Sequence, residues 1–190
     1  MAKFFGNLHL VLATGLVLAV FLMFHFAGVV AVDASSVLRW LHVFFGIVWI
    51  GLLYYLNFVQ VPTMPAIPAE QKGAITGHIA PKVLFFFHYG ALFTVLTGLA
   101  IAFIGGYGHQ ALTFSGEGTV NLIGIGMWLA LIMAFNVWFI IWPAQKKILG
   151  IVEASAEEKA AAGPRALYAS RTNVLLSLPM LYCMVSANLG

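Results

Sequence analysis

Hydrophobic residues fall into five long runs, and the short segments between them hold most of the charged residues. Each of the first four runs exceeds the roughly 20 apolar residues that a helix needs to cross a bilayer. The fifth is shorter and contains Pro179. The pattern predicts an all-α integral membrane protein, a five-transmembrane-helix bundle forming a single transmembrane domain over 1–190. The expected spans are about 8–32, 37–61, 82–105, 119–142 and 172–189.

The polar connections refine this prediction. Residues 145–171 are rich in alanine, glutamate and lysine, which favour helix, so we expect a cytoplasmic helical segment there. Pro62 and Pro143 are expected to end the second and fourth spans, and Pro81 stands near the start of the third.

The basic residues predict the orientation of the bundle. With five spans, eight of the nine lysines and arginines lie on one side and only Arg39 lies on the other. Positive charge is concentrated in cytoplasmic loops. The N-terminus is therefore expected in the cytoplasm and the C-terminus in the periplasm.

Composition excludes several classes of protein. Hydrophobic residues make up 62% of the chain and charged residues 8%, with a mean hydropathy of +0.99, whereas soluble domains have about 25% charged residues. The net charge of +3 comes from scattered residues and does not indicate nucleic-acid binding. Cys183 is the single cysteine, so neither a disulfide framework nor a CxxCH motif for covalent haem attachment is present. The first apolar run is too long for a signal-peptide core and is expected to be retained.

Three histidines, His25, His42 and His88, lie inside apolar runs. An ionisable side chain in hydrocarbon is costly and indicates a functional site, and imidazole is a common axial ligand of haem iron. Counting residues from the span ends places His25 and His42 roughly 8–10 Å inside the external face. His88 lies on the cytoplasmic side, on the order of 15 Å from His42 along the membrane normal. Either two haems at two depths or one haem with a different second ligand would fit this separation.

These positions give the candidate site. His42 and His88 are the expected haem ligands, and His25 and His9 are the opposite partners in a two-haem arrangement. Arg39 could pair with haem propionates or act as an interfacial anchor. As an alternative, each imidazole could bond only a neighbouring carbonyl. Copper or zinc could also bind imidazole, although no compact ligand motif is present in the spans.

Side-chain amides form a second polar group near the cytoplasmic end. They could bond one another across helices, because buried amides need partners. They could instead form a pocket for a quinone or another small redox partner. The residues are Asn57, Gln60, Asn136 and Asn173.

Two segments carry a family resemblance. Arg39–Tyr55, RWLHVFFGIVWIGLLYY, resembles a recurring span of bacterial proteins with the membrane-bound urate oxidase (urate hydroxylase) N-terminal domain. Asn136–Lys147, NVWFIIWPAQKK, is similar to a second signature of that family. The first segment is also similar to the bacterial membrane-bound protoporphyrinogen oxidase, a helical protein that binds haem b. The resemblance covers about 36–150.

The resemblance implies a multi-pass protein of the bacterial inner membrane, with His42 as the leading haem ligand and Trp49 on the same helix face. Full-length urate enzymes of the family carry a C-terminal cytochrome c domain, which this chain lacks. We therefore expect a stand-alone electron-transfer b-type cytochrome, or a redox enzyme acting with a separate partner, rather than a complete urate oxidase.

Three functions follow from these observations. The first is a haem b cytochrome-like protein, with one or two haems, that passes electrons between a quinone or small reductant and a partner. The second is a membrane oxidase acting on a purine-like or porphyrin-like substrate, and the third is a cofactor-free accessory or assembly subunit. The expected partners are membrane lipid and a cytochrome c or other respiratory protein, with no nucleic acid; association with a second copy is left open.

Overall fold

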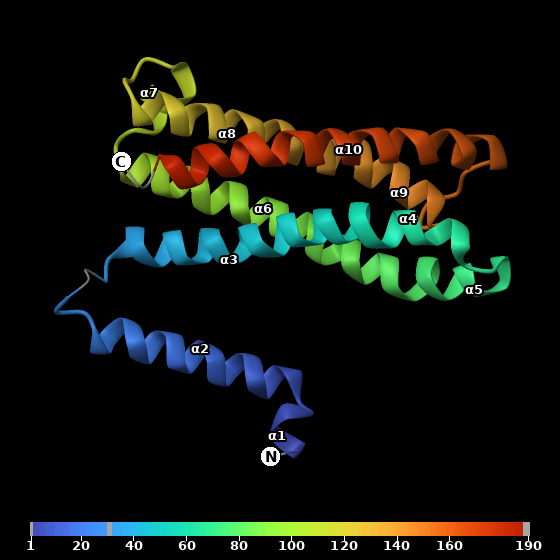
Figure 1. The fold of residues 1–190 in the computed structure, drawn as a ribbon, viewed down its shortest axis with the longest axis horizontal. Coiled ribbons are helices and arrows are strands. Elements are labelled where there is room, and N and C mark those ends of the chain that lie inside the picture. Colours follow the sequence, from blue (N-terminus) through green and yellow to red (C-terminus); the bar gives the residue numbers. More distant parts are fainter. Residues whose placement is uncertain (1, 30–31, 188–190) are drawn as a thin grey trace. The chain divides into compact units, whose positions relative to one another are not determined.

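The computed structural model describes residues 2–29 and 32–187, and every regular element within them is helical (Figure 1). This confirms the all-α prediction. Four continuous helical runs are long and apolar enough to cross a membrane, as in a multi-pass membrane protein. These runs are Leu8–His25, Ala34–Ala66, Ala69–Ile104 and Thr119–Ile148.

The chain divides into two compact units, Met1–Val37 and Leu38–Gly190. The first unit contains α1 (Ala2–Phe5) and α2 (Leu8–His25). The side-chain oxygen of Asn7 accepts a hydrogen bond from the Leu10 amide and caps the first turn of α2. No residue of α2 is buried, as expected for a helix whose apolar side chains face lipid.

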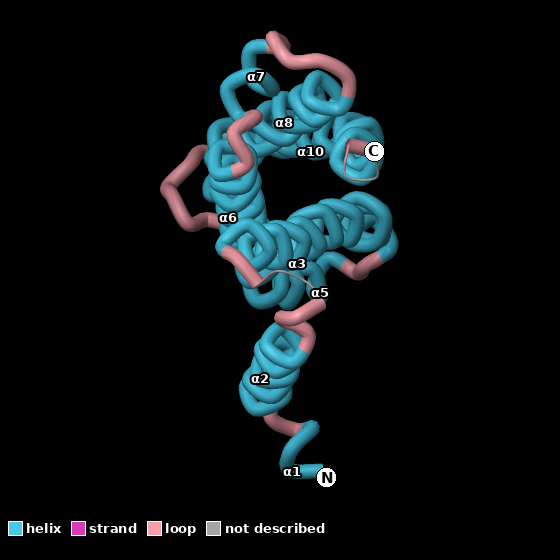
Figure 2. The backbone as a smooth tube through the Cα atoms, turned by 90° about the vertical axis from the view of Figure 1, so that its left-hand side faces the viewer, coloured by secondary structure: helices cyan, strands magenta, loops and turns pink. Residues whose placement is uncertain are grey.

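The second unit holds most of α3 and all later elements. Their bounds are α3 Ala34–Tyr54, η1 Tyr55–Gln60, α4 Val61–Thr63, η2 Met64–Ala66, α5 Ala69–Ala74, η3 Ile75–Ile79, α6 Ala80–Ile104, α7 Gly108–Thr113, α8 Thr119–Phe135, η4 Asn136–Ile141, α9 Trp142–Ile148 and α10 Ala156–Ser186. Within this unit α3, α6, α8 and α10 surround a common interior (Figure 2).

Three prolines are accommodated by π-helical turns rather than by helix ends. Proline has no N–H and its ring crowds the carbonyl four residues earlier. Before each proline the backbone widens to a five-residue spacing, as in η1, where the Val61 N–H donates to the Leu56 carbonyl just ahead of Pro62. The same turn is present in η3 and η4. The helical backbone therefore continues past Pro62 and Pro143, where we expected the spans to end.

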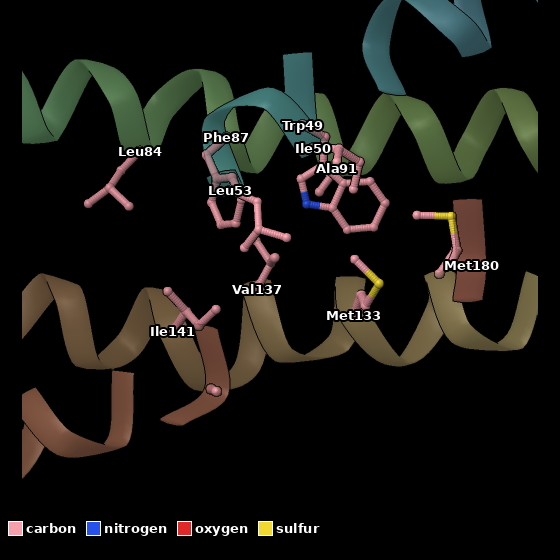
Figure 3. Packing of buried hydrophobic residues seen from close by; sticks show 12 residues of the cluster. Trp49, Ile50, Leu53, Leu84, Phe87, Ala91, Met133, Val137, Ile141 and Met180 are labelled. Carbon is pink, nitrogen blue, oxygen red and sulfur yellow. The ribbon is translucent and has the colours of Figure 1, made fainter. Parts of the chain in front are cut away.

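The core of the second unit is aromatic and aliphatic (Figure 3). Trp49, Phe87, Met133 and Val137 have no exposed surface, and they come from α3, α6, α8 and η4. Their packing holds these elements together at mid-height of the bundle.

The C-terminal helix α10 is continuous over 31 residues. Ser155 and Glu158 form a reciprocal capping box at its start, which fixes where the helix begins. Of the polar segment expected at 145–171, residues 156–171 share one helix with the span expected at 172–189, from Ala156 to Ser186, whereas 149–155 are not helical. Residues 188–190 lie outside the described part of the chain. Because α10 is not among the four apolar runs, the count of five spans and their orientation stay predictions.

Candidate functional site: a cavity beside His42

Four helices of the second unit enclose a cavity of about 720 Å³. This volume lies within the range of about 300–1,000 Å³ that is usual for small-molecule and cofactor sites. Most of the lining is apolar, and its polar side chains include Arg39 and His42 of α3. Trp49 also lines the cavity; its indole Nε1 is buried and has no hydrogen-bond partner within the described residues.

The imidazole of His42 is held by α6. Its Nδ1 lies 2.9 Å from the Thr94 carbonyl oxygen and 3.2 Å from Thr97 Oγ1. A carbonyl oxygen only accepts, so we assign the proton to Nδ1, which donates to Thr94. The other nitrogen, Nε2, then carries the lone pair, and it has no hydrogen bond to the described residues. An imidazole anchored through Nδ1 to a carbonyl is the usual arrangement of a histidine that ligates a metal through Nε2.

Gly98 makes room for this ring. A Cβ at position 98 would lie 2.8 Å from His42 Cε1 and 3.2 Å from Nδ1. Carbon atoms in contact normally stand about 3.5–4.0 Å apart. The close approach of α3 and α6 at this point therefore requires glycine.

Polar groups gather at the Arg39 end of the cavity. Arg39 lies one helical turn before His42, and Tyr107, which follows α6, lines the same end. Burial raises the pKa of the Tyr107 phenol, and the positive charge of Arg39 partly opposes that rise. This end offers a guanidinium and a neutral hydroxyl, which suit a carboxylate or another acceptor.

His88 lies elsewhere and does not line this cavity. Its Nδ1 donates to the Leu84 carbonyl in its own helix, and its ring packs edge-on against Trp138 and Trp142. Its Nε2 is buried and unpartnered within the described residues. Since His42 bonds Thr94, six residues after His88, the two imidazoles lie about 9 Å or more apart along α6.

The amides predicted near the cytoplasmic end bond across helices, beside the π-helical turns. Asn57 donates from Nδ2 to the Leu53 carbonyl and to Ser170 Oγ, at 2.9 and 2.7 Å. Asn136 donates to Asn173 Oδ1 at 2.9 Å. A widened helical turn disturbs the backbone ladder, and in lipid no water can satisfy the affected carbonyls. These bonds give Asn57, Asn136 and Asn173 a structural role, whereas Asn57 Oδ1 and Gln60 Oε1 are buried without a partner in the described residues. None of the four amides lines the cavity.

The remaining predicted ligands belong to the first unit. His9 and His25 are both exposed on α2, and the His25 ring stacks on Phe21 of the same helix, with ring centroids 5.6 Å apart. Across the described residues, no group of three or more histidine, cysteine, aspartate or glutamate side chains could hold a metal ion.

Sequence reasoning missed several residues of the cavity. Gly98 is a single glycine in an apolar helix, and only its contact with His42 shows its role. Three methionines of α8 and α10 also line the cavity. These are Met127, Met180 and Met184.

The sequence model of the urate oxidase N-terminal family matches residues 89–190. The chain belongs to the urate oxidase N-terminal family. The match covers the second signature, at 136–147, and the α6, α8 and α10 walls of the cavity, whereas Arg39 and His42 precede it. No curated protein and no solved structure matches the chain.

Proposed function

We propose that this member of the urate oxidase N-terminal family is a membrane redox protein that binds haem b in the cavity, where His42 Nε2 would hold the iron. The observation that carries the proposal is the anchored His42 ring, because its Nδ1 is committed to Thr94 and its lone pair has no partner in the described residues. Bound haem b supplies one-electron chemistry at the iron.

The residues around His42 fit such a group. The cavity is apolar and of suitable size, which keeps a macrocycle dry. Arg39 and Tyr107 face the end where propionate carboxylates would lie. The thioethers of Met127, Met180 and Met184 line the same cavity, and methionine paired with histidine is a known haem ligand set.

The geometry favours one haem per chain. His88 lies at another level, in a packed aromatic environment, so His42 and His88 would not ligate the same iron. A second haem at His88 is the two-haem alternative. Electron exchange with a quinone or small reductant on one side and a cytochrome c on the other, in a bacterial inner membrane, completes the proposed role.

A second candidate function is a membrane oxidase that takes a purine-like or porphyrin-like substrate into the same cavity. Membership of the urate oxidase N-terminal family favours it. Both functions use His42, but only the first requires a resident haem.

An absorption spectrum tests the proposal. The full chain, purified in detergent from haem-sufficient cells, is expected to show a reduced b-type α-band that is lost in His42→Ala and kept in His88→Ala. Size-exclusion and circular dichroism profiles of the two variants establish that each is folded. A colourless wild-type preparation would contradict the haem proposal and favour the accessory-subunit alternative. Loss of the band only in His88→Ala would instead assign the haem to His88.

A further inference from the structure

The cavity has one wall that is both apolar and exposed. On α3, Val43, Ile47 and Gly51 line the cavity at a spacing of four residues and are exposed, Val43 and Ile47 by 54% and 68%. On α10, Leu181 and Val185 do the same, at 37% and 59%. Residues four apart share one helix face. The two stripes therefore form the edges of an opening, which we call the α3–α10 slot.

The other walls are closed. Thr94 and Ala102 of α6 and Met127 and Ala130 of α8 line the cavity and are all at most 8% exposed. Access on these sides would require the helices to separate.

Hydrogen bonds close the slot at one end. Tyr54 Oη and Ser177 Oγ are 2.9 Å apart, and Asn57 Nδ2 donates to Ser170 Oγ at 2.7 Å. These two bonds join the end of α3 and the start of η1 to α10, on the C-terminal side of Gly51. From Gly51 to Arg39 the slot runs twelve residues, about 18 Å along a helix. The α3 edge belongs to a run apolar enough to cross a membrane, so the slot opens towards hydrocarbon rather than water.

We infer that the ligand of this cavity enters sideways from the bilayer through the α3–α10 slot, and is therefore an amphiphile with an apolar body and an anionic edge. The apolar stripes accept the body, while Arg39 and Tyr107 receive the acidic edge. The inference deepens the proposed function: haem and other dicarboxylate porphyrins have this chemistry, whereas a freely water-soluble purine does not. It thereby distinguishes between the two substrate classes of the oxidase alternative.

Gly51 provides a way to close the slot. A Cβ at this position meets no atom within 4 Å, so a side chain can begin there without displacing the described structure. Gly51→Phe places a ring in the slot. Val43→Phe places a ring in the slot nearer to Arg39. Val59→Phe is the matched control for Val43→Phe, since Val59 is 52% exposed on the same continuous helix but does not line the cavity.

The first measurement needs no haem. A chain that keeps Trp49 as its only tryptophan is reconstituted into phosphatidylcholine vesicles with or without brominated acyl chains. Trp49 has no exposed surface, yet its fluorescence is expected to be quenched nearly as strongly as that of a chain keeping only Trp128, which is 44% exposed. Gly51→Phe and Val43→Phe should remove most of the Trp49 quenching, and Val59→Phe should leave it unchanged. An unquenched Trp49 in the unplugged chain, as when another helix covers the slot, would overturn the inference.

The second measurement follows haem uptake by apoprotein from haem-loaded vesicles. Uptake is expected to be several-fold slower in Gly51→Phe and Val43→Phe than in Val59→Phe. Equal rates in all variants would overturn lateral entry even where haem binds. No haem uptake by any variant, together with quenched Trp49, would refute the haem proposal and leave the slot in place. Thermal unfolding of each variant in detergent confirms that the plugs have not disturbed the fold.

Discussion

The contact between Gly98 and His42 gives the sharpest prediction about the site. In Gly98→Ala the new methyl would stand 2.8 Å from His42 Cε1, so the ring must retreat by roughly 0.7 Å to reach normal contact. Because Nδ1 is held 2.9 Å from the Thr94 oxygen, that movement strains or breaks the hydrogen bond that sets the tautomer.

The expected energy follows from these terms. Overpacking costs about 1–3 kcal/mol, and a weakened hydrogen bond costs about 1 kcal/mol. Replacing glycine by alanine inside a helix returns about 1 kcal/mol. We expect Gly98→Ala to be destabilised by about 1–3 kcal/mol, from the balance of these terms, and to lose or shift the haem spectrum.

Gly51→Ala is the matched control. It has the same chemistry and the same helical setting, but its Cβ meets nothing within 4 Å. It should be neutral or stabilised by up to about 1 kcal/mol, with an unchanged spectrum. Denaturant unfolding in detergent and the reduced-minus-oxidised spectrum measure both effects. If Gly98→Ala behaved like Gly51→Ala in both assays, the position assigned to the His42 ring beside Gly98 would be refuted.

Three further predictions concern pairs of polar groups: the Asn136–Asn173 amides, Arg39 with Tyr107 at one end of the cavity, and Lys147 with Glu158. In a double-mutant cycle of Asn136→Ala and Asn173→Ala, the 2.9 Å bond should appear as a coupling of about 0.6–1.7 kcal/mol in unfolding; zero coupling would mean that the amides do not pair. Arg39→Gln should raise the pKa of the Tyr107 phenol further, because it removes the positive charge that opposes the rise caused by burial. The titration is followed by tyrosinate absorbance and assigned to Tyr107 with Tyr107→Phe; an unchanged pKa would mean that the two groups do not interact. The side-chain hydrogen bond from Lys147 is the largest cause, and the backbone hydrogen bond from Ser155 the next, of a Glu158 pKa below its ordinary value. The resulting stabilisation is complete above the ordinary glutamate pKa and is lost as the pH falls through the lowered pKa. NMR titration of the Glu158 carboxyl should give a higher pKa in Lys147→Met, and an equal pKa would argue against the ion pair.

The helical fold was predictable because apolar runs of spanning length leave few alternatives, and the backbone of a span must satisfy its own hydrogen bonds. The ends of the helices were less predictable. Pro62 and Pro143 indicate helix ends by local rules, yet the π-helical turns before them carry the helix onward, supported by amides such as Asn57 and Asn136. The side-chain support comes from a distant helix, which no local pattern reveals.

The candidate site divides in the same way. His42 stood out in the sequence as an ionisable residue in an apolar run, and Arg39 and Trp49 followed from the same helix. The partners that give His42 its chemistry, Thr94 and Gly98, lie more than fifty residues away and became visible only when α6 packed on α3. His88 shares the sequence signal of His42 but packs against two tryptophans, so position in an apolar run alone did not distinguish the two.

The central claim is that His42 Nε2 ligates haem iron, and chemical rescue tests it most directly. His42→Gly removes the ligand and leaves space beside Gly98 for free imidazole to occupy. Purified with haem and titrated with imidazole, His42→Gly should regain the wild-type b-type spectrum in a saturable manner, and Gly98→Ala/His42→Gly should need more imidazole. A His42→Gly protein that keeps the wild-type spectrum without imidazole would contradict the assignment of His42 as the ligand.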